Sequence, residues 1–154
     1  MTVLGGAPIM AADVNEALNR EIDADIATSN GTATNAGTGA ELLDKSLTVA
    51  MKAGRTYRIS SIFPMNGSVA NDDFYTLIRA GTSTSDTQLA FVTTRIHATA
   101  RTWYATFWAD FVCPADGNYT FGVFYRRAAG TGTCTPVGAA SSPRIFSIDL
   151  KTTA

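Results

Sequence analysis

The chain has 154 residues, which is enough for one domain of ordinary size with its own hydrophobic core. Its 12 Lys and Arg residues nearly balance 13 Asp and Glu residues, so it lacks the positive field that holds nucleic acid or an anionic membrane. Charged residues make up only 16% of the sequence, a low share that is typical of surfaces where subunits pack on one another.

Residues 1–28 are predicted to form an amino-terminal arm that includes one helix, over residues 10–24. Apolar side chains recur there at every fourth position, which favours an amphipathic helix; they are Val14, Leu18, Ile22 and Ile26. The apolar stripe is narrow, and a helix of a few turns is marginal unless it docks. We therefore expect this segment to anchor the chain to another protein, with Ile9, Val14, Leu18 and Ile22 as the contacts.

The terminus has no basic region followed by a continuous apolar run, so it does not read as a signal peptide. No run approaches the roughly 20 apolar residues that a spanning helix needs. We expect synthesis in the cytoplasm.

Residues 29–41 are rich in Gly, Thr, Asn and Ser and predict a linker or a frayed strand. From residue 42 to residue 154 the pattern changes to short alternating segments bounded by Gly, Pro, Asn, Asp or Ser, which predicts about eight strands. The turn at residues 52–55, KAGR, predicts a β-hairpin. With hardly any helix between the strands, the fold class is all-β: an antiparallel jelly roll or β-sandwich preceded by a short helix.

The expected core comes from the inward positions of these strands. Its members are Leu47, Val49, Tyr57, Ile59, Phe63, Phe74, Leu77, Leu89, Phe91, Trp103, Phe107, Phe111, Tyr119, Phe121, Val123, Ile148 and Leu150.

The stretch TWYATFWADFVCP, residues 102–114, has aromatic residues in both registers of a strand. One register runs from Trp103 to Phe111 and suits the core, whereas the other carries Tyr104, Thr106 and Trp108 where water is expected. Three explanations are open: cover from the same chain, a subunit interface, or a platform on which a sugar ring stacks.

Catalytic signatures are weak. His97 is the single histidine and follows a strand, which is more typical of a surface residue than of a base. Asp110 with Asp116 or Asp149 is the nearest approach to a pair of catalytic carboxylates, although solvated charges explain them better. The arginines at 126, 127 and 144 are the only candidates for a small anion-binding patch, and rim contacts explain them better.

Cys113 and Cys134 have no CxxC spacing and only one histidine to accompany them, so a zinc site is not expected. The favoured interpretation is two buried thiols. The alternative is a disulfide between strand ends, which a reducing cytosol disfavours.

Three motifs resemble small virion proteins of tailed bacteriophages. Residues 9–15, IMAADVN, resemble the leader that precedes a helix in tail-fibre and other virion proteins. Residues 53–59, AGRTYRI, and residues 116–133, DGNYTFGVFYRRAAGTGT, are similar to two strand-and-turn motifs of small phage jelly rolls.

This resemblance implies a non-enzymatic virion structural protein, with a capsid decoration or head-fibre protein preferred. The alternatives are a tail-fibre or baseplate component that binds a host glycan, and a carbohydrate-binding module. The expected partners are further copies of the chain in a homotrimer, and the major capsid protein or another virion protein. No cofactor, metal, nucleic acid or membrane partner is expected.

Overall fold

The structure is a computed structural model that describes residues 20–37, 40–99 and 101–151. These residues form nine strands in two antiparallel sheets and no helix. The strands are β1 (Arg20–Ala27), β2 (Leu42–Met51), β3 (Thr56–Gly67), β4 (Asp73–Arg79), β5 (Gln88–Arg95), β6 (Trp103–Val112), β7 (Gly117–Ala129), β8 (Cys134–Pro136) and β9 (Arg144–Lys151). In the described part of the chain, no helix is available that could span a membrane.

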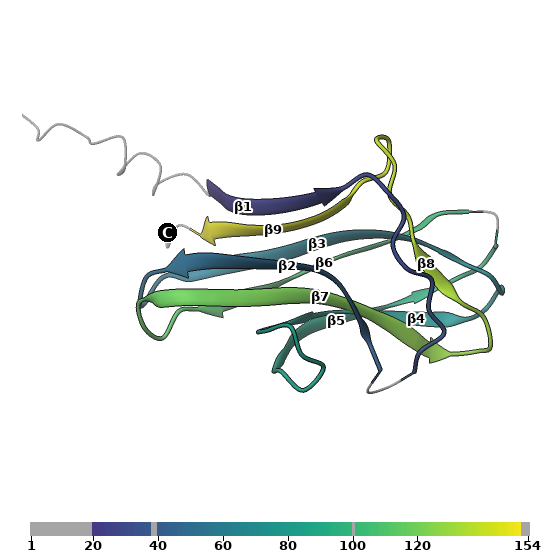
Figure 1. The fold of residues 1–154 in the computed structure, drawn as a ribbon, viewed down its shortest axis with the longest axis horizontal. Coiled ribbons are helices and arrows are strands. Elements are labelled where there is room, and N and C mark those ends of the chain that lie inside the picture. The colour runs from purple at the N-terminus through teal and green to yellow at the C-terminus, as the bar shows by residue number, and fades with distance from the viewer. Residues whose placement is uncertain (1–19, 38–39, 100, 152–154) are drawn as a thin grey trace, which may run out of the picture.

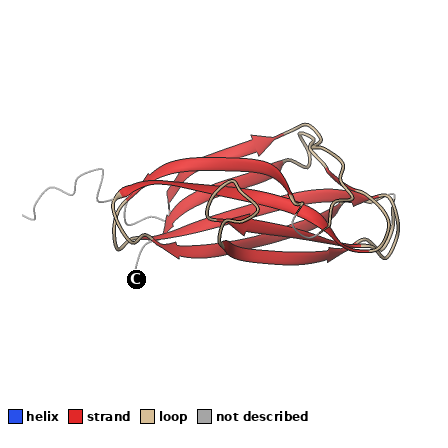
Figure 2. Ribbon diagram, turned by 60° about the horizontal axis from the view of Figure 1, so that its bottom comes forward, coloured by secondary structure: helices blue, strands red, loops and turns tan. Residues whose placement is uncertain are grey.

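The two sheets lie face to face as a sandwich with loops at both ends (Figures 1 and 2). Sheet A has the order β1-β9-β3-β6, with the three-residue β8 paired to β3, and sheet B has the order β2-β7-β4-β5. When β8 is left out and the eight longer strands are numbered 1 to 8 in chain order, their order is 1-8-3-6 in sheet A and 2-7-4-5 in sheet B. This is the connectivity of a jelly roll. The predicted all-β antiparallel sandwich is confirmed, as is every strand expected from Leu42 onward.

The core lies between the sheets and follows the predicted inward register. Ten of the expected members belong to this buried core, and Leu89, Trp103, Phe111, Tyr119 and Leu150 pack against them at the margins. Leu77 is buried as well, but it lies on the outer face of sheet B and not between the sheets. Phe91 was expected inside, and this is wrong: it lies opposite Leu77 on the outer face of sheet B and is 54% exposed. Strand β5 is the edge of that sheet, so its alternation alone does not say which of its faces is covered.

The predicted helix over residues 10–24 is wrong for residues 20–24, the part of it that the structure describes. Residues 20–24 belong to β1, which pairs with β9 from Arg20 to Ala27, while residues 10–19 lie outside the described residues. Ile22, expected on the helix stripe, lies at a bulge in β1 and is partly exposed. Of the other expected anchor residues, Ile9, Val14 and Leu18 also lie outside the described residues.

Because β1 is the first strand of the jelly roll, the sandwich includes residues from the expected arm and does not begin at Leu42. Of the segment expected as a linker, residues 29–41, the part over residues 30–34 lies against β8 and the loop after it. Thr34 is buried and exchanges two backbone hydrogen bonds with Cys134, and the Gly31 amide donates to the Pro136 carbonyl at 2.9 Å.

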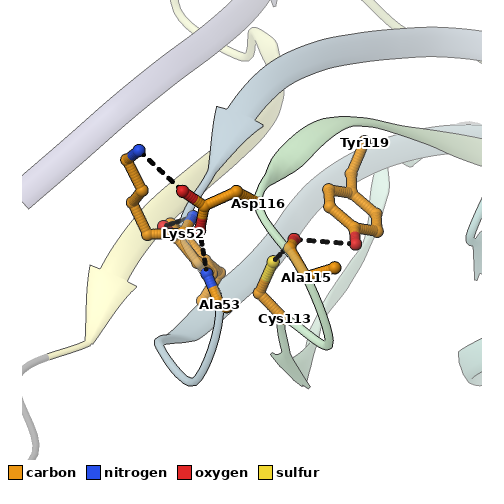
Figure 3. Close-up of polar contacts among 7 residues, drawn as sticks. Lys52, Ala53, Cys113, Ala115, Asp116 and Tyr119 are labelled. Carbon is orange, nitrogen blue, oxygen red and sulfur yellow. Dashed lines mark hydrogen bonds and ion pairs between the residues drawn. The ribbon is translucent and has the colours of Figure 1, made fainter.

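The KAGR turn was expected to close a hairpin, and this is also wrong. Strand β2 lies in sheet B and β3 in sheet A, so the turn carries the chain from one sheet to the other. Gly54 adopts φ 74°, a conformation that suits glycine. Asp116, from the turn between β6 and β7, accepts from the Ala53 amide and the Lys52 ammonium at 2.8 Å each (Figure 3). Two of the motifs identified in the sequence therefore meet at one end of the sandwich.

Two ion pairs join the sheets along the edge where β1 and β9 approach β2. Arg144 of β9 contacts Asp44 of β2 at 2.9 Å, and both side chains are almost completely buried. Lys45 contacts Asp25 of β1 at 3.0 Å nearby. Charges directed into the sandwich at an edge strand discourage pairing with a foreign strand.

Candidate functional site

Tyr104, Thr106 and Trp108 lie together on the outer face of sheet A, as their shared register predicts. Tyr104 is 53% exposed and Trp108 is 56% exposed, and Thr106 between them is exposed as well. Among the described residues, neither the sandwich nor its loops bury these side chains. Cover from the described part of the same chain is therefore not the explanation for the second aromatic face of β6.

The strand register extends this face across all four long strands of sheet A, since residues directly opposite one another point to the same side. One row across the sheet is apolar and consists of Thr106, Ile62, Ile145 and Ile26. The next row consists of Trp108, Ser60, Ser147 and Ala24. Neither row contains a charged side chain. We call these rows, with Tyr104 and Val112 on β6, the β6 face.

Exposed apolar surface is concentrated here. Of the nine large apolar side chains that the described residues leave exposed, five belong to the β6 face, and these are Ile26, Ile62, Tyr104, Trp108 and Val112. Adjacent strands are about 4.8 Å apart, so the row from Thr106 to Ile26 spans on the order of 14 Å. Contiguous apolar surface of this kind marks an interaction site more often than a solvated face.

The two aromatic side chains are held in place. The Tyr104 hydroxyl is 2.6 Å from the Ser142 hydroxyl, which belongs to the loop between β8 and β9. The Arg58 guanidinium lies 5.2 Å from the centre of the Trp108 ring, close enough for a cation–π contact. Ordered side chains lose little entropy when a partner covers them.

A third row adds charge at one end of the face and consists of Asp110, Arg58, Asp149 and Glu21. Arg58 donates to both oxygens of Asp110, at 3.0 and 3.3 Å, and Lys151 donates to one of them at 2.7 Å. These hydrogen bonds lower the pKa of the Asp110 carboxyl to about 2. Both oxygens of Asp110 are thus occupied within the chain.

Asp149 has the opposite environment. Burial raises the pKa of its carboxyl, and the negative charge of Glu21 directly opposite raises it further, while Arg58 lowers it. The row is therefore acidic at the end formed by Glu21 of β1 and Asp149 of β9. At the β6 end, Asp110 lies between Arg58 and the ammonium of Lys151 from β9, and these three groups have one excess positive charge.

The residues considered for catalysis are not brought together. Asp110 and Asp149 flank Arg58 on a sheet face, and Asp116 lies in the turn of Figure 3. The exposed His97 ring is 5.1 Å from Trp103, in centroid separation, which makes it part of a surface ring contact. Within the described ranges there is no group of three or more His, Cys, Asp or Glu residues placed to hold a metal ion.

Of the arginines considered as an anion-binding patch, Arg126 and Arg127 lie on β7 of sheet B, whereas Arg144 lies on β9 of sheet A. Arg144 is buried against Asp44, whereas Arg126 is 3.2 Å from Glu41 and lies over the Tyr75 ring at 4.3 Å. Sequence reasoning missed the resulting cluster on the outer face of sheet B, where Arg79 also approaches Glu41 at 3.5 Å.

Cys113 and Cys134 are both buried free thiols, which confirms the favoured interpretation over a disulfide. Burial raises the pKa of the Cys134 thiol to about 12, so this group is not a nucleophile. The Cys113 Sγ donates to the Ala115 carbonyl at 2.9 Å (Figure 3).

No protein-family model matches this chain, and no curated protein matches it. Solved structures that it is similar to include one named "CBM4 structure and function", at 16% identity and a TM-score of 0.37, over 69% of this chain and 59% of that one. Infectious bursal virus T=1 particles match at 8% identity and a TM-score of 0.46, over 100% of this chain and 41% of that one. The Gt strain of infectious bursal disease virus matches at 10% identity and a TM-score of 0.45, over 100% and 43%.

The chain thus spans 59% of the CBM4 chain and about two fifths of the two viral chains. All three TM-scores lie below 0.5.

Proposed function

We propose that this chain is a non-enzymatic structural protein of a virus particle, and within that class a capsid decoration or head-fibre protein of a tailed phage. The observation that carries the proposal is the β6 face, an uncovered and mostly uncharged sheet face on a jelly roll. A protein that acts by assembly needs such a surface, whereas an enzyme needs a concave site with reactive groups. The resemblance of residues 9–15, 53–59 and 116–133 to phage virion proteins supports the same class.

A catalytic role is disfavoured by the state of the polar groups on this face. Asp110 remains ionised at any ordinary pH because of Arg58 and Lys151, so it cannot serve as a general acid. Its neighbour Asp149 lies beyond Arg58 on an open sheet, and not across a cleft. Glycosidic cleavage requires two carboxyl groups that face a sugar from opposite sides.

Attachment to the particle is assigned to the amino-terminal segment, now limited to residues 1–19 because β1 belongs to the sandwich. The jelly roll then forms the exposed knob, and the protein is a homotrimer that contacts the major capsid protein or another virion protein. The protein is made in the host cytoplasm and is found in the virion.

A second candidate is a tail-fibre or baseplate component, or a carbohydrate-binding module, that binds a glycan on the β6 face. The exposed rings of Tyr104 and Trp108 favour it, since such rings stack on sugars. It is the weaker candidate because the charged groups beside Trp108 already bond one another and leave few free donors and acceptors.

The deciding experiment locates the protein on purified particles by mass spectrometry and by labelling with gold-conjugated antibodies. We expect the label on the head. Label on the tail supports the glycan-binding alternative, and absence of the protein from purified particles contradicts both virion assignments.

A further inference from the structure

The β6 face is an unpartnered surface whose occupant can be argued from its charges. The rows that contain Ile62 and Trp108 carry no charge, and the third row pairs Arg58 and Lys151 with Asp110 inside the chain. A strongly charged partner such as nucleic acid gains little from such a surface. The occupant is therefore itself largely apolar, with few charges.

The remaining charge has a direction across the sheet. Glu21 of β1 and Asp149 of β9 are two negative charges at one end of the row. At the other end, Asp110 of β6 contacts Arg58 of β3 and the ammonium of Lys151, which extends from β9, and this group has one excess positive charge. A surface that is acidic on one side and basic on the other complements a copy of itself, because the acidic side of one copy meets the basic side of the next. Head-to-tail contacts close into a ring when the rotation between neighbouring copies closes on itself, and a threefold rotation gives a trimer.

We infer that the β6 face is buried by further copies of this chain in the homotrimer, with Thr106 near the centre of the contact and Trp108 as its main anchor. The inference rests on the homotrimer within the proposed function and names its interface. Trp and Tyr are enriched in interface cores, and Trp108 is already ordered by Arg58. Glu21 and Asp149 of one copy lie toward Arg58 and Lys151 of its neighbour.

Thr106→Arg is the direct test, because Thr106 is exposed in the middle of a strand and its replacement disturbs no core contact. Thr93→Arg is the matched control: Thr93 is also an exposed mid-strand threonine, but it lies on the outer face of sheet B opposite Tyr75. Circular dichroism and thermal unfolding of both variants establish that the fold is retained.

Sedimentation of the wild-type protein and of Thr93→Arg should give about three times 16.3 kDa, whereas Thr106→Arg should give the monomer mass. Trp108→Ala should weaken association by about 30-fold or more, which is typical of truncating an interface aromatic residue. Phe91→Ala removes a similarly exposed ring from sheet B and should leave association unchanged.

A wild-type monomer at 100 µM overturns the inference, and it is the result expected if a glycan or an unrelated protein occupies the face. A Thr106→Arg variant that remains as oligomeric as Thr93→Arg places the interface elsewhere and also overturns it. Neither result removes the protein from the particle, so localisation on particles separates failure of this inference from failure of the virion assignment.

Discussion

At the scale of single residues, the two aspartates beside Arg58 have opposite electrostatic environments on one sheet face. Hydrogen bonds from Arg58 and Lys151 lower the pKa of Asp110 to about 2, and burial with the charge of Glu21 raises the pKa of Asp149. Ionised Asp110 therefore stabilises the fold above the ordinary carboxyl pKa, and this stabilisation is lost as pH falls toward 2. Asp149 acts in the other direction, because the fold favours its protonated form and this stabilisation is lost as pH rises through its elevated pKa.

We predict that Asp110→Asn lowers stability at pH 7 and that Asp149→Asn leaves it unchanged or raises it. Both differences from the wild-type protein should shrink as pH falls toward 2, because Asp149 is then protonated and Asp110 approaches its own pKa of about 2. Urea unfolding midpoints measured from pH 7 to pH 2 provide the test, with each variant as the control for the other. Equal shifts in the same direction at pH 7 contradict the assignment. Because Asp110 is partly exposed, its effect is modest.

At the scale of strands, the sequence contained the signal for β1, but a second pattern concealed it. Glu21, Asp23 and Asp25 alternate with Ile22, Ala24 and Ile26, which is a strand pattern. Residues four apart, such as Ile22 and Ile26, satisfy both a strand period of two and an approximate helical repeat. The alternation favours a strand here because the edge of β9 offers backbone partners that an isolated helix does not have.

The strands from Leu42 onward were predictable because apolar and polar residues alternate along them, as expected of strands with one face in the core and one face in solvent. Their assignment to sheets was not, as the KAGR turn shows, since a tight turn with Gly54 is compatible with a hairpin or with a crossing between sheets. The outward register of Tyr104, Thr106 and Trp108 was predictable from β6 alone. The Ile62 and Ile26 part of the same face was not, because it depends on strand pairings between residues far apart in the sequence.

A prediction at this scale concerns the link between β2 and β9. The side chains of Asp44 and Arg144 are 4% and 6% exposed, and burial raises the pKa of Asp44 although Arg144 lowers it. Asp44→Ala leaves a buried arginine without its counter-ion, so it should cost about 3–5 kcal/mol of unfolding free energy. Asp73→Ala is the matched control, because Asp73 pairs with the exposed Arg95 at 2.8 Å and its loss should cost about 0–1 kcal/mol. Chemical unfolding compares them, and equal losses contradict the role given to the buried pair.

At the scale of the whole molecule, the jelly roll begins at β1, which is earlier in the chain than the sequence indicated, and this shortens the segment that we propose as the anchor. The composition change near Leu42 marks the end of an irregular segment, yet that segment is bonded to β8, and β1 lies before it. The jelly roll therefore needs a strand from the expected arm to complete sheet A. Only residues 1–19 remain available for attachment without loss of a strand.

This boundary gives the last prediction, which uses two truncations. Removal of residues 1–18 should leave a folded oligomer with an unfolding midpoint within a few degrees of the wild-type protein, but it should abolish incorporation into particles. Removal of residues 1–27 also deletes β1, which pairs with β9 over its whole length, supplies the buried Ala27 and holds Lys45 through Asp25.

The longer truncation should be strongly destabilised or aggregate, because the edge of β9 then presents unpaired backbone groups to other chains. Circular dichroism, thermal unfolding and sedimentation measure folding and association, and particle purification measures incorporation. If the chain without residues 1–27 unfolds at the wild-type temperature, β1 is dispensable and the anchor can extend to Ala27. If the chain without residues 1–18 still joins particles, the jelly roll itself makes the attachment. The virion contact then has to be sought on a surface other than the β6 face, which the proposed homotrimer buries.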